Sequence, residues 1–250
     1  MKRSKKRIEP RKIYVKTKYR NIEKILAISS GKGGVGKSTI SGFFSMYLAQ
    51  KGYKVGLLDL DLYGPSCHLV LGANIKEYPK EEKGVVPPVA QGVYFMSSVF
   101  YTENRPLVVR GSGLNDAAIE LLTITNWPDL DYLIIDMPPG LGDILLDVSE
   151  LLPARFVVIT NQSRISMESV NKLISYIKDQ NLPFLGIVEN MKMIEDNFIE
   201  MESKAQGIFY LGKVDFYSDI EKYYGNKREF SNSKLYEDIS KIWEKLNGKI

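Results

Sequence analysis

Cysteine is almost absent from this chain: Cys67 is the only one among 250 residues. A single thiol makes no disulfide within the chain, which excludes a disulfide-stabilised secreted scaffold and favours a reducing, cytoplasmic compartment. It also excludes a zinc or iron–sulfur site that one chain would build from several thiolates. Functions that depend on a self-contained, cysteine-rich metal site are therefore set aside.

Long apolar runs are missing as well. The sequence holds no stretch of about 18 consecutive apolar residues, so no membrane-spanning helix is predicted. The first residues are basic and lead into more charge rather than an apolar segment, and we expect no secretory signal. The composition, 44% hydrophobic and 26% charged, is typical of a soluble globular chain with a sizeable core.

Acidic residues are scarce at the N-terminus. Residues 1–20 hold ten Lys or Arg and one acid, which leaves 24 basic and 29 acidic residues in the rest of the chain. We therefore predict a basic, flexible arm over 1–22 and a single domain over 23–250. The arm is either a contact for nucleic acid or another acidic partner, or a disordered solubilising segment. Because only Tyr14 and Tyr19 add aromatic rings to it, composition favours the second interpretation.

Short apolar segments alternate with longer helical stretches from residue 24 onward. The segments are bounded by Gly, Pro or Asp, as buried parallel strands are. Strands are expected at 25–29, 54–58, 93–97, 132–135, 156–160, 185–188 and, more weakly, 208–211. Helices are expected at about 37–51, 113–125, 143–152, 166–180, 216–224 and 233–247, and 73–92 as an irregular surface segment. The alternation predicts an α/β fold, a doubly wound, mostly parallel sheet with helices on both faces and its ligand at the carboxyl ends of the strands.

A glycine-rich loop follows the first expected strand and precedes a helix. It consists of Gly31, Lys32, Gly33, Gly34, Val35, Gly36, Lys37, Ser38 and Thr39, and it matches the P-loop pattern G-x-x-x-x-G-K-[ST]. Glycines let successive backbone N–H groups converge on phosphate oxygens, and the helix adds its positive N-terminal end. We expect Lys37 at the β- and γ-phosphates, Ser38 at Mg²⁺ and Thr39 at the α-phosphate. A chance glycine-rich turn is the alternative, and it leaves the strand–loop–helix context unexplained.

Three acids stand at strand ends beside this loop. Asp59 and Asp61 follow the second strand, and their two-residue spacing in an extended chain points both carboxylates to one face. We expect Asp59 to hold Mg²⁺ through its hydration shell and Asp61 to position an attacking water, with a turn cap or a solvated loop as the alternative. Asp136 ends an apolar strand in the Walker B arrangement and is expected on the Mg²⁺ side. An apolar strand ending in Asp is common, and the P-loop makes the combination specific.

Lys32 is not required for an ordinary phosphate cradle. It is either an exposed loop charge or a cation that reaches phosphates in a partner subunit. The string GKGGVGKST resembles the deviant P-loop of the ParA/MinD class, whose members carry this lysine and form ATP-dependent dimers. The resemblance implies that Lys32 neutralises transition-state charge across a homodimer that sandwiches the nucleotide. It also implies that the carboxamide of Asn190, at the end of another strand, contacts adenine rather than only occupying a turn.

Longer strings narrow the resemblance further. Residues 59–66, 131–143 and 186–191 look like the Mrp/ApbC family of MinD-like ATPases, which serve as iron–sulfur cluster carriers. Residues 109–111 are similar to that family's Arg-Gly-Pro element, with Ser112 where proline is usual. The resemblance covers about 24–225 and implies an ATPase linked to iron–sulfur cluster assembly or transfer.

One departure from the family concerns its Cys-x-x-Cys pair, with which a dimer bridges a cluster. The matching stretch, 191–207, reads MKMIEDNFIEMESKAQG and holds no cysteine. Cluster ligation typically needs four thiolates, and a symmetric dimer of this chain offers two copies of Cys67. Cys67 and His68 are therefore expected to be structural, and an iron–sulfur cluster is not expected from this chain alone.

The C-terminal segment repeats apolar residues at helical spacing. Leu235, Ile239, Ile242, Trp243 and Leu246 form one face, which lies either on a membrane or on the domain. Neighbouring acids oppose attraction to anionic lipid, so the packed helix is favoured.

The residues and the resemblance together predict a cytoplasmic, Mg²⁺-dependent ATPase that closes into a homodimer and hydrolyses ATP slowly. Its expected role is in iron–sulfur cluster assembly or transfer with a client or carrier protein, without cluster ligands of its own. The alternative is a ParA/MinD-like positioning or partition ATPase whose basic arm binds DNA, and a weaker one is a nucleotide-dependent scaffold with negligible turnover. The preference for ATP over GTP rests on the resemblance.

Overall fold

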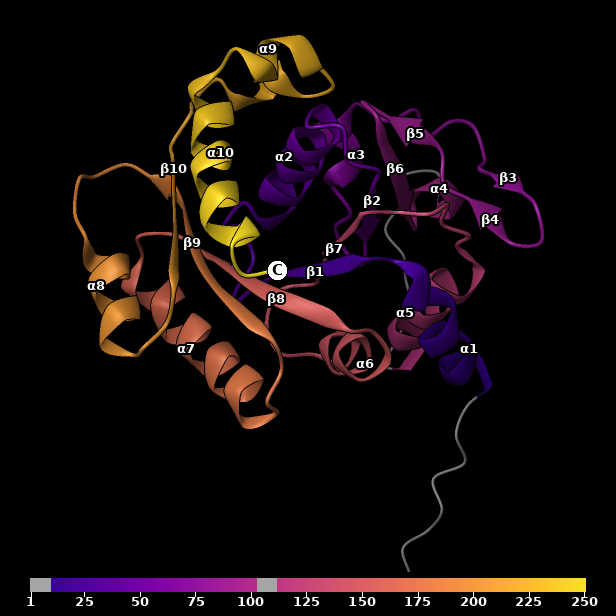
Figure 1. Ribbon diagram of the computed structural model, residues 1–250, viewed down its shortest axis with the longest axis horizontal. Coiled ribbons are helices and arrows are strands. Elements are labelled where there is room, and N and C mark those ends of the chain that lie inside the picture. Colours follow the sequence, from indigo (N-terminus) through magenta and orange to yellow (C-terminus); the bar gives the residue numbers. More distant parts are fainter. Residues whose placement is uncertain (1–9, 103–111) are drawn as a thin grey trace, which may run out of the picture.

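The computed structural model describes residues 10–102 and 112–250, and a central sheet runs through this part of the chain. The strands of the sheet are β1 (Lys24–Ser30), β2 (Val55–Asp59), β5 (Val89–Ala90), β6 (Val93–Ser97), β7 (Tyr132–Asp136), β8 (Ala154–Thr160), β9 (Phe184–Lys192) and β10 (Tyr210–Asp215). Their order is β10-β9-β8-β1-β7-β2-β6-β5 (Figure 1). All neighbouring pairs are parallel except β5–β6. The expected doubly wound, mostly parallel fold is confirmed.

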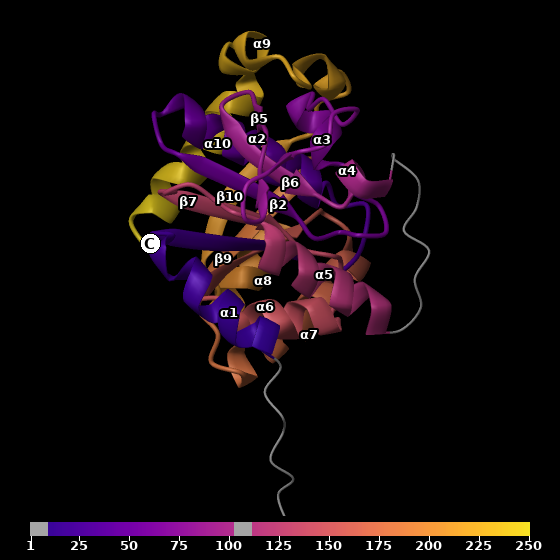
Figure 2. The ribbon, with the colours of Figure 1, turned by 90° about the vertical axis from the view of Figure 1, so that its right-hand side faces the viewer.

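Helices cover both faces of this sheet. They are α1 (Pro10–Lys18), α2 (Lys37–Gln50), α3 (Cys67–Leu71), α4 (Val99–Thr102), α5 (Ser112–Ile124), α6 (Asp143–Leu151), α7 (Arg164–Asp179), α8 (Phe198–Ala205), α9 (Lys227–Ser231) and α10 (Lys234–Asn247). Figures 1 and 2 show α2, α3 and α10 on one side of the sheet and α1, α5, α6 and α7 on the other. The inner strands β1 and β7 are buried along almost their whole length, as parallel strands between two helical layers are.

Some elements differ from the sequence-based expectation. Strand β9 continues to Lys192, beyond the expected end at 188. The helix expected at 216–224 is only a 3₁₀ turn, Ile220–Tyr223. The segment expected to be irregular contains β5 and a separate small hairpin of β3 (Lys80–Glu81) and β4 (Val85–Val86). These elements are short, and short elements carry too little periodicity to be recognised in a sequence.

The N-terminal segment also differs from the flexible arm expected over 1–22. Residues 10–18 form α1, a 3₁₀ turn follows at Tyr19–Asn21, and Val15, Tyr19 and Ile22 are buried. The basic side chains pair with acids of α5 and α6: Arg11 Nη2 lies 3.1 Å from Asp116 Oδ1, Lys12 bonds Asp147, and Lys16 Nζ lies 3.8 Å from Glu150 Oε1. Composition alone did not show that apolar residues at positions 15, 19 and 22 face the core. Residues 1–9 lie outside the described part of the chain.

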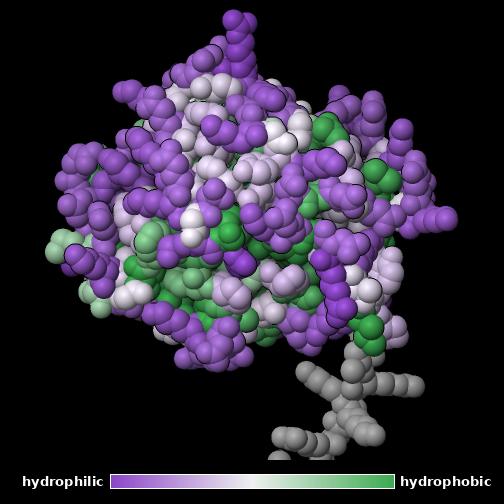
Figure 3. All heavy atoms as spheres, viewed as in Figure 1, coloured by the Kyte–Doolittle hydropathy of each residue, from purple (hydrophilic) through white to green (hydrophobic). Residues whose placement is uncertain are grey.

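The C-terminal helix packs on the domain, as favoured above. Its apolar face, made of Leu235, Ile239, Ile242, Trp243 and Leu246, is buried. In Figure 3, hydrophilic side chains cover the region of α9 and α10, and hydrophobic ones gather lower on the same face. Within the described residues, no helix is both long and apolar enough to cross a bilayer.

Candidate functional site

The glycine-rich loop joins the end of β1 to the start of α2, at the carboxyl edge of the sheet. Gly36 precedes the helix with φ of 76°, a left-handed conformation that favours glycine. A Cβ at Gly31 would stand 2.6 Å from the backbone of Ser169 in α7, and one at Gly36 would stand 2.3 Å from the Asn190 amide nitrogen. Glycine is therefore required at Gly31 by close packing, and at Gly36 by both packing and conformation.

A cavity of about 230 Å³ opens over this loop. It is lined by Ser30, Lys32, Gly33, Gly34, Val35, Gly36, Lys37, Ser38, Thr39, Asp61, Gly64, Ser66 and Pro139. The loop, the segment after β2 and the segment after β7 thus surround one space. The loop N–H groups and the start of α2 make this space suited to an anion such as phosphate.

Asp136, the last residue of β7, is the centre of the polar contacts below the cavity. Its Oδ2 accepts hydrogen bonds from Lys37 Nζ at 2.8 Å and Ser38 Oγ at 2.6 Å, and its Oδ1 accepts one from Ser41 Oγ at 2.7 Å. Burial lowers the pKa of Lys37, but the Asp136 carboxylate outweighs this effect and raises the pKa above its ordinary value. Lys37 is therefore a charged donor beside the loop.

Sequence reasoning missed Ser41. It lies four residues after Lys37 in α2, so both side chains leave the same face of the helix. The four-residue spacing from Lys37 could have indicated that Ser41 faces the same site. The P-loop pattern, however, ends at residue 38 or 39 and does not include Ser41. Its bond to Asp136 fixes the carboxylate from the side opposite to Lys37.

Asp59 is fully buried at the end of β2, opposite Asp136 in the register of the two strands. Its Oδ1 accepts from the Asp61 N–H at 3.1 Å, and its Oδ2 accepts from the N–H groups of Ser66 and Cys67, both at 3.2 Å. Burial, followed by repulsion from Asp136, raises the pKa of Asp59 to about 7. Two buried carboxylates here share one lysine, and the excess negative charge favours a cation.

Asp61 and Lys32 line the cavity from two different loops. Asp61 Oδ2 lies 3.7 Å from Lys37 Nζ, and its side chain is only 17% exposed. Lys32 is partly exposed, and its side chain forms no ion pair with any residue that the structure describes. The structure therefore brings Asp61 to the same lysine as Asp136 and leaves the Lys32 charge available at the rim.

Asn190 lies near the end of β9 and is buried. Its amide nitrogen donates to the Val35 carbonyl at 2.8 Å, so the side chain braces the phosphate loop. The expected contact with adenine stays a prediction. The bond to Val35 uses the amide nitrogen of Asn190, and the amide oxygen is the atom that could contact the base.

The residues beneath the cavity fit a divalent cation. Carboxylate oxygens of Asp59 and Asp136 and the sulfur of Cys67 lie within 4.8 Å of one another. The Ser38 hydroxyl bonds the same Asp136 oxygen that accepts from Lys37. Carboxylate and hydroxyl oxygens are ligands that Mg²⁺ accepts, directly or through water.

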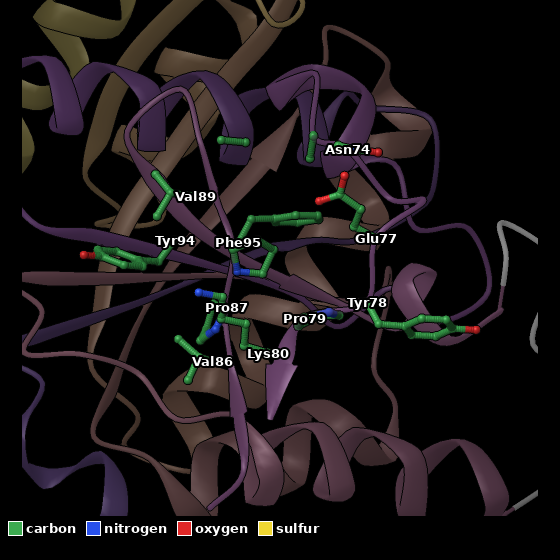
Figure 4. Close-up of a pocket in the computed structure, with 13 residues that line it drawn as sticks. Asn74, Glu77, Tyr78, Pro79, Lys80, Val86, Pro87, Val89, Tyr94 and Phe95 are labelled. Carbon is green, nitrogen blue, oxygen red and sulfur yellow. The ribbon is translucent and has the colours of Figure 1, made fainter. Parts of the chain in front are cut away.

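Two larger cavities lie elsewhere. One, of about 490 Å³, is formed by residues 73–80, the hairpin strand β4 and strands β5 and β6, with aromatic and proline side chains along its walls (Figure 4). A second, of about 400 Å³, lies between β10 and α10. Neither contains a predicted site residue, and size is a weaker sign of function here than the converging groups of the smaller cavity.

The fold and the site together define a class. A parallel sheet whose first strand ends in a P-loop, with the loop lysine and serine bonded to an aspartate at the end of a neighbouring strand, is a P-loop nucleotide-binding domain.

Comparison with known proteins gives the family. The model described as ParA, NUBPL iron-transfer P-loop NTPase, matches residues 21–250, and the chain belongs to this family. The iron–sulfur cluster carrier protein of Pseudomonas fragi is 43% identical over 175 residues, which cover 68% of this chain and 61% of that protein. The protein of the same name from Saccharolobus solfataricus is 40% identical over 182 residues, 71% of this chain and 62% of that protein. The chain thus spans less than two thirds of each relative's length.

Solved structures agree with the fold. An Archaeoglobus fulgidus nucleotide-binding protein, described in complex with ADP and with cobalt, has a TM-score of 0.75 and 27% identity and covers 91% of this chain and 96% of its own. The septum site-determining protein MinD of Pyrococcus horikoshii, complexed with Mg-ADP, has a TM-score of 0.67 at 21% identity, with 90% and 96% covered. The second likeness shows the fold alone.

Proposed function

We propose that this chain is a Mg²⁺-dependent, ATP-hydrolysing homodimeric switch that serves iron–sulfur cluster assembly or transfer in the cytoplasm. The observation that carries the proposal is the convergence of Lys37 and Ser38 on Asp136 beneath the cavity of about 230 Å³ that the phosphate loop lines. The names of the relatives support the iron–sulfur role, and the ADP complex of the Archaeoglobus fulgidus neighbour supports nucleotide binding.

The chain's own residues divide the work on ATP. The backbone of the glycine-rich loop holds the phosphates, Thr39 contacts the α-phosphate, and Lys37 neutralises charge on the β- and γ-phosphates. Asp61 orients a water molecule toward the γ-phosphorus, so that ATP and water become ADP and inorganic phosphate. Asn190 contributes to adenine binding through its amide oxygen, which accepts no hydrogen bond from the part of the chain that the structure describes.

Ser38, Asp59 and Asp136 are the residues that would hold Mg²⁺ in this site. The ion, when bound, neutralises phosphate charge beside the loop. Asp59 and Asp136 are already buried together without a full complement of positive charge, which is the property that suits them to this task.

Lys32 is the residue through which two copies of the chain would complete the site. Its side chain forms no ion pair within residues 10–102 and 112–250, and a cation supplied by a partner subunit stabilises transition-state charge as an arginine finger does. The test measures molar mass by light scattering with ATP, with ADP and without nucleotide, together with phosphate release. Wild type is expected to dimerise with ATP, and Lys32→Ala to bind ATP but lose most of its turnover. A monomer in every condition, or full turnover by Lys32→Ala, contradicts the dimeric mechanism.

The cluster itself would need ligands from another protein. Residues 191–207 hold no cysteine, and Cys67 is buried. We therefore propose a client or carrier that brings its own thiolates and responds to the nucleotide state of this chain. Anaerobic incubation with iron and sulfide is expected to leave the purified chain colourless, while addition of an apo client with exposed thiols in the presence of ATP produces a bound species. Cluster absorbance in the chain alone refutes the requirement for a client.

A DNA-positioning role is the second candidate, because five of residues 1–9 are Lys or Arg. Against it, the basic residues of α1 pair with acids of α5 and α6. ATP-stimulated, salt-sensitive retention of DNA that disappears when residues 1–9 are deleted would favour it. Retention that ignores both nucleotide and the deletion would refute it.

A further inference from the structure

A further cavity lies at the amino edge of the sheet, at the end of the strands opposite to the phosphate loop. It has a volume of about 250 Å³ and opens where the chain enters β1 and β7. Its wall is made of Tyr14, Lys18, Asn21, Ile22, Asn126, Trp127, Pro128 and Asp129. Two aromatic rings and one lysine therefore share a space that has no role in the chemistry proposed above.

Lys18 differs from the other basic side chains of α1. The other three each pair with an acid of α5 or α6. Lys18 Nζ instead donates to the carbonyl oxygen of Thr123, near the end of α5, at 2.7 Å, and it lies 5.4 Å from the centre of the Tyr14 ring. Among the residues that the structure describes, it has no carboxylate within ion-pair distance, although the exposed Asp129 lines the same cavity. Neutral groups therefore hold this amine in place.

The position of the Lys18 amine favours its neutral form. The side chain is partly buried, and burial without a compensating anion lowers its pKa to about 8. The acids that α5 presents to α1, Asp116 and Glu120, are engaged by Arg11. At pH 7.5 about a quarter of the Lys18 amines are then neutral, against roughly one in a thousand for an ordinary lysine. A neutral amine is a nucleophile, and the cavity leaves room beside it for a reacting group.

We propose that Lys18 is a modification site, at which the chain accepts a short acyl group from a donor of the thioester class. The neutral nitrogen attacks the carbonyl carbon of the donor, so that an N–C bond forms and the C–S bond breaks. The sulfur leaves with the electron pair as a thiolate, and the proton that the nitrogen loses reaches this sulfur through solvent. The products are an uncharged amide on Lys18 and a free thiol.

The cavity suits the product as well as the reaction. An amide carries no charge, so the cost of keeping the end of the Lys18 side chain partly buried falls. Its N–H retains the Thr123 carbonyl as an acceptor. The side chains of Tyr14, Ile22 and Trp127 offer apolar surface to an acyl chain of a few carbon atoms. Because the phosphate loop lies at the other edge of the sheet, the modification does not depend on the nucleotide.

The test compares the acylation of two lysines of the same helix. The full chain is incubated at pH 7.5 with the acetyl thioester of N-acetylcysteamine, and mass spectrometry of its peptides follows the acetylated fraction of each lysine. Lys16 is the internal control, because its side chain is 44% exposed and pairs with Glu150. Lys18 is expected to react about tenfold faster, since its larger neutral fraction outweighs the lower basicity of its nitrogen. Exposure alone gives the opposite order, so an equal or faster reaction of Lys16 overturns the assignment.

The pH dependence of the Lys18 reaction is a second readout. Its rate should level off between about pH 8 and 9, as the amine becomes fully neutral. Access to the cavity alone gives no plateau in this range. A rate that keeps rising about tenfold per pH unit up to pH 10 contradicts the proposal.

A variant that adds a carboxylate to the cavity separates the amine's environment from its accessibility. Asn21→Asp changes an exposed residue of the cavity wall and supplies the anion that Lys18 lacks. Acetylation of Lys18 is expected to fall about tenfold, because a nearby negative charge favours the ammonium form. Asn74→Asp, at an exposed position in the wall of a different cavity, is the matched control and should react as wild type. An unchanged rate in folded Asn21→Asp, or an equal loss in the control, overturns the assignment. If Asn21→Asp fails to fold by circular dichroism, the wild-type pH profile decides.

Discussion

Two buried lysine–carboxylate pairs stand at the carboxyl edge of the sheet, and they differ in how completely their charges are satisfied. Lys37 and Asp136 meet at the end of β7, beside a second buried carboxylate, Asp59. Lys192 and Glu189 meet at the end of β9, where Lys192 Nζ lies 3.1 and 3.2 Å from the two carboxylate oxygens. The first pair lies below the cavity over the phosphate loop, and the second lies at the wall of the cavity between β10 and α10, which Lys192 and Tyr210 line.

The second pair is balanced within the protein. The Tyr210 hydroxyl donates to Glu189 Oε2 at 2.6 Å, and Lys192 also bonds the Asp196 carbonyl oxygen. Burial, with the adjacent Glu189, raises the pKa of Tyr210, so it stays a donor. At the first pair, one lysine serves more acids than it can neutralise. The difference teaches that an incompletely satisfied charge cluster marks a ligand site, and a satisfied one marks structure.

Removing the lysine of the first pair should have the largest effect on function. Lys37→Ala is expected to weaken ATP binding about a hundredfold or more and to abolish turnover, because a charge-assisted contact to phosphate is lost. Isothermal titration calorimetry and phosphate release measure the two quantities. Unchanged hydrolysis would refute the role of the loop.

Removing the lysine of the second pair should act on stability instead. Lys192→Met leaves Glu189 buried without its cation and is expected to lower the free energy of unfolding by roughly 3–5 kcal/mol. Urea unfolding of the nucleotide-free chain measures the loss. Nucleotide affinity of the folded variant should stay close to wild type, and a loss comparable to that of Lys37→Ala would show that the two pairs are not separate. The double variant Lys192→Met with Glu189→Leu is the control and should recover much of the loss.

The two pairs were not equally visible in the sequence. The P-loop pattern and the apolar strand ending in Asp136 predicted the first pair. In both patterns the functional residue stands at a fixed position relative to its neighbours in the sequence, and its chemical role is known. Lys192 and Glu189 lie in a strand that was expected to end at 188, and no short pattern shows that Tyr210, from another strand, completes their hydrogen bonds. Ser41 and the packing of α1 were missed for a related reason: each depends on a contact between elements distant in sequence. The central strands were predictable because burial on both faces gives them continuous apolar runs.

The pH dependence of stability should distinguish the first pair further. The folded-state pKa of Asp59 is about 7, above its ordinary value of 3.8, so the folded state holds this proton more tightly than the unfolded state. The contribution of Asp59 to the free energy of unfolding is therefore fully present below about pH 4. As the pH rises to 7, this contribution falls, by up to about 4 kcal/mol. Unfolding of the nucleotide-free chain across this range measures the slope.

A variant at Asp59 shows how much of this pH dependence comes from its carboxyl group. Asp59→Asn cannot ionise and is expected to lose this part of the pH dependence, whereas Lys192→Met should keep it. Mg²⁺ with an ATP analogue should also flatten the slope in the wild type, because a cation favours the ionised carboxylate. A wild-type slope that persists in Asp59→Asn would assign the effect to other groups.

The smallest expected effect belongs to Asn190, which touches the first site without carrying charge. Asn190→Ala removes the bond to the Val35 carbonyl and leaves that oxygen buried, so the loop loses a brace while its own glycines still set its shape. We expect nucleotide affinity to fall by about tenfold, with turnover at saturation changed less, since the loop binds ground and transition states alike. Comparing ATP with GTP sharpens the result. A loss for ATP alone would assign Asn190 to the base, and an equal loss for both would assign it to the loop.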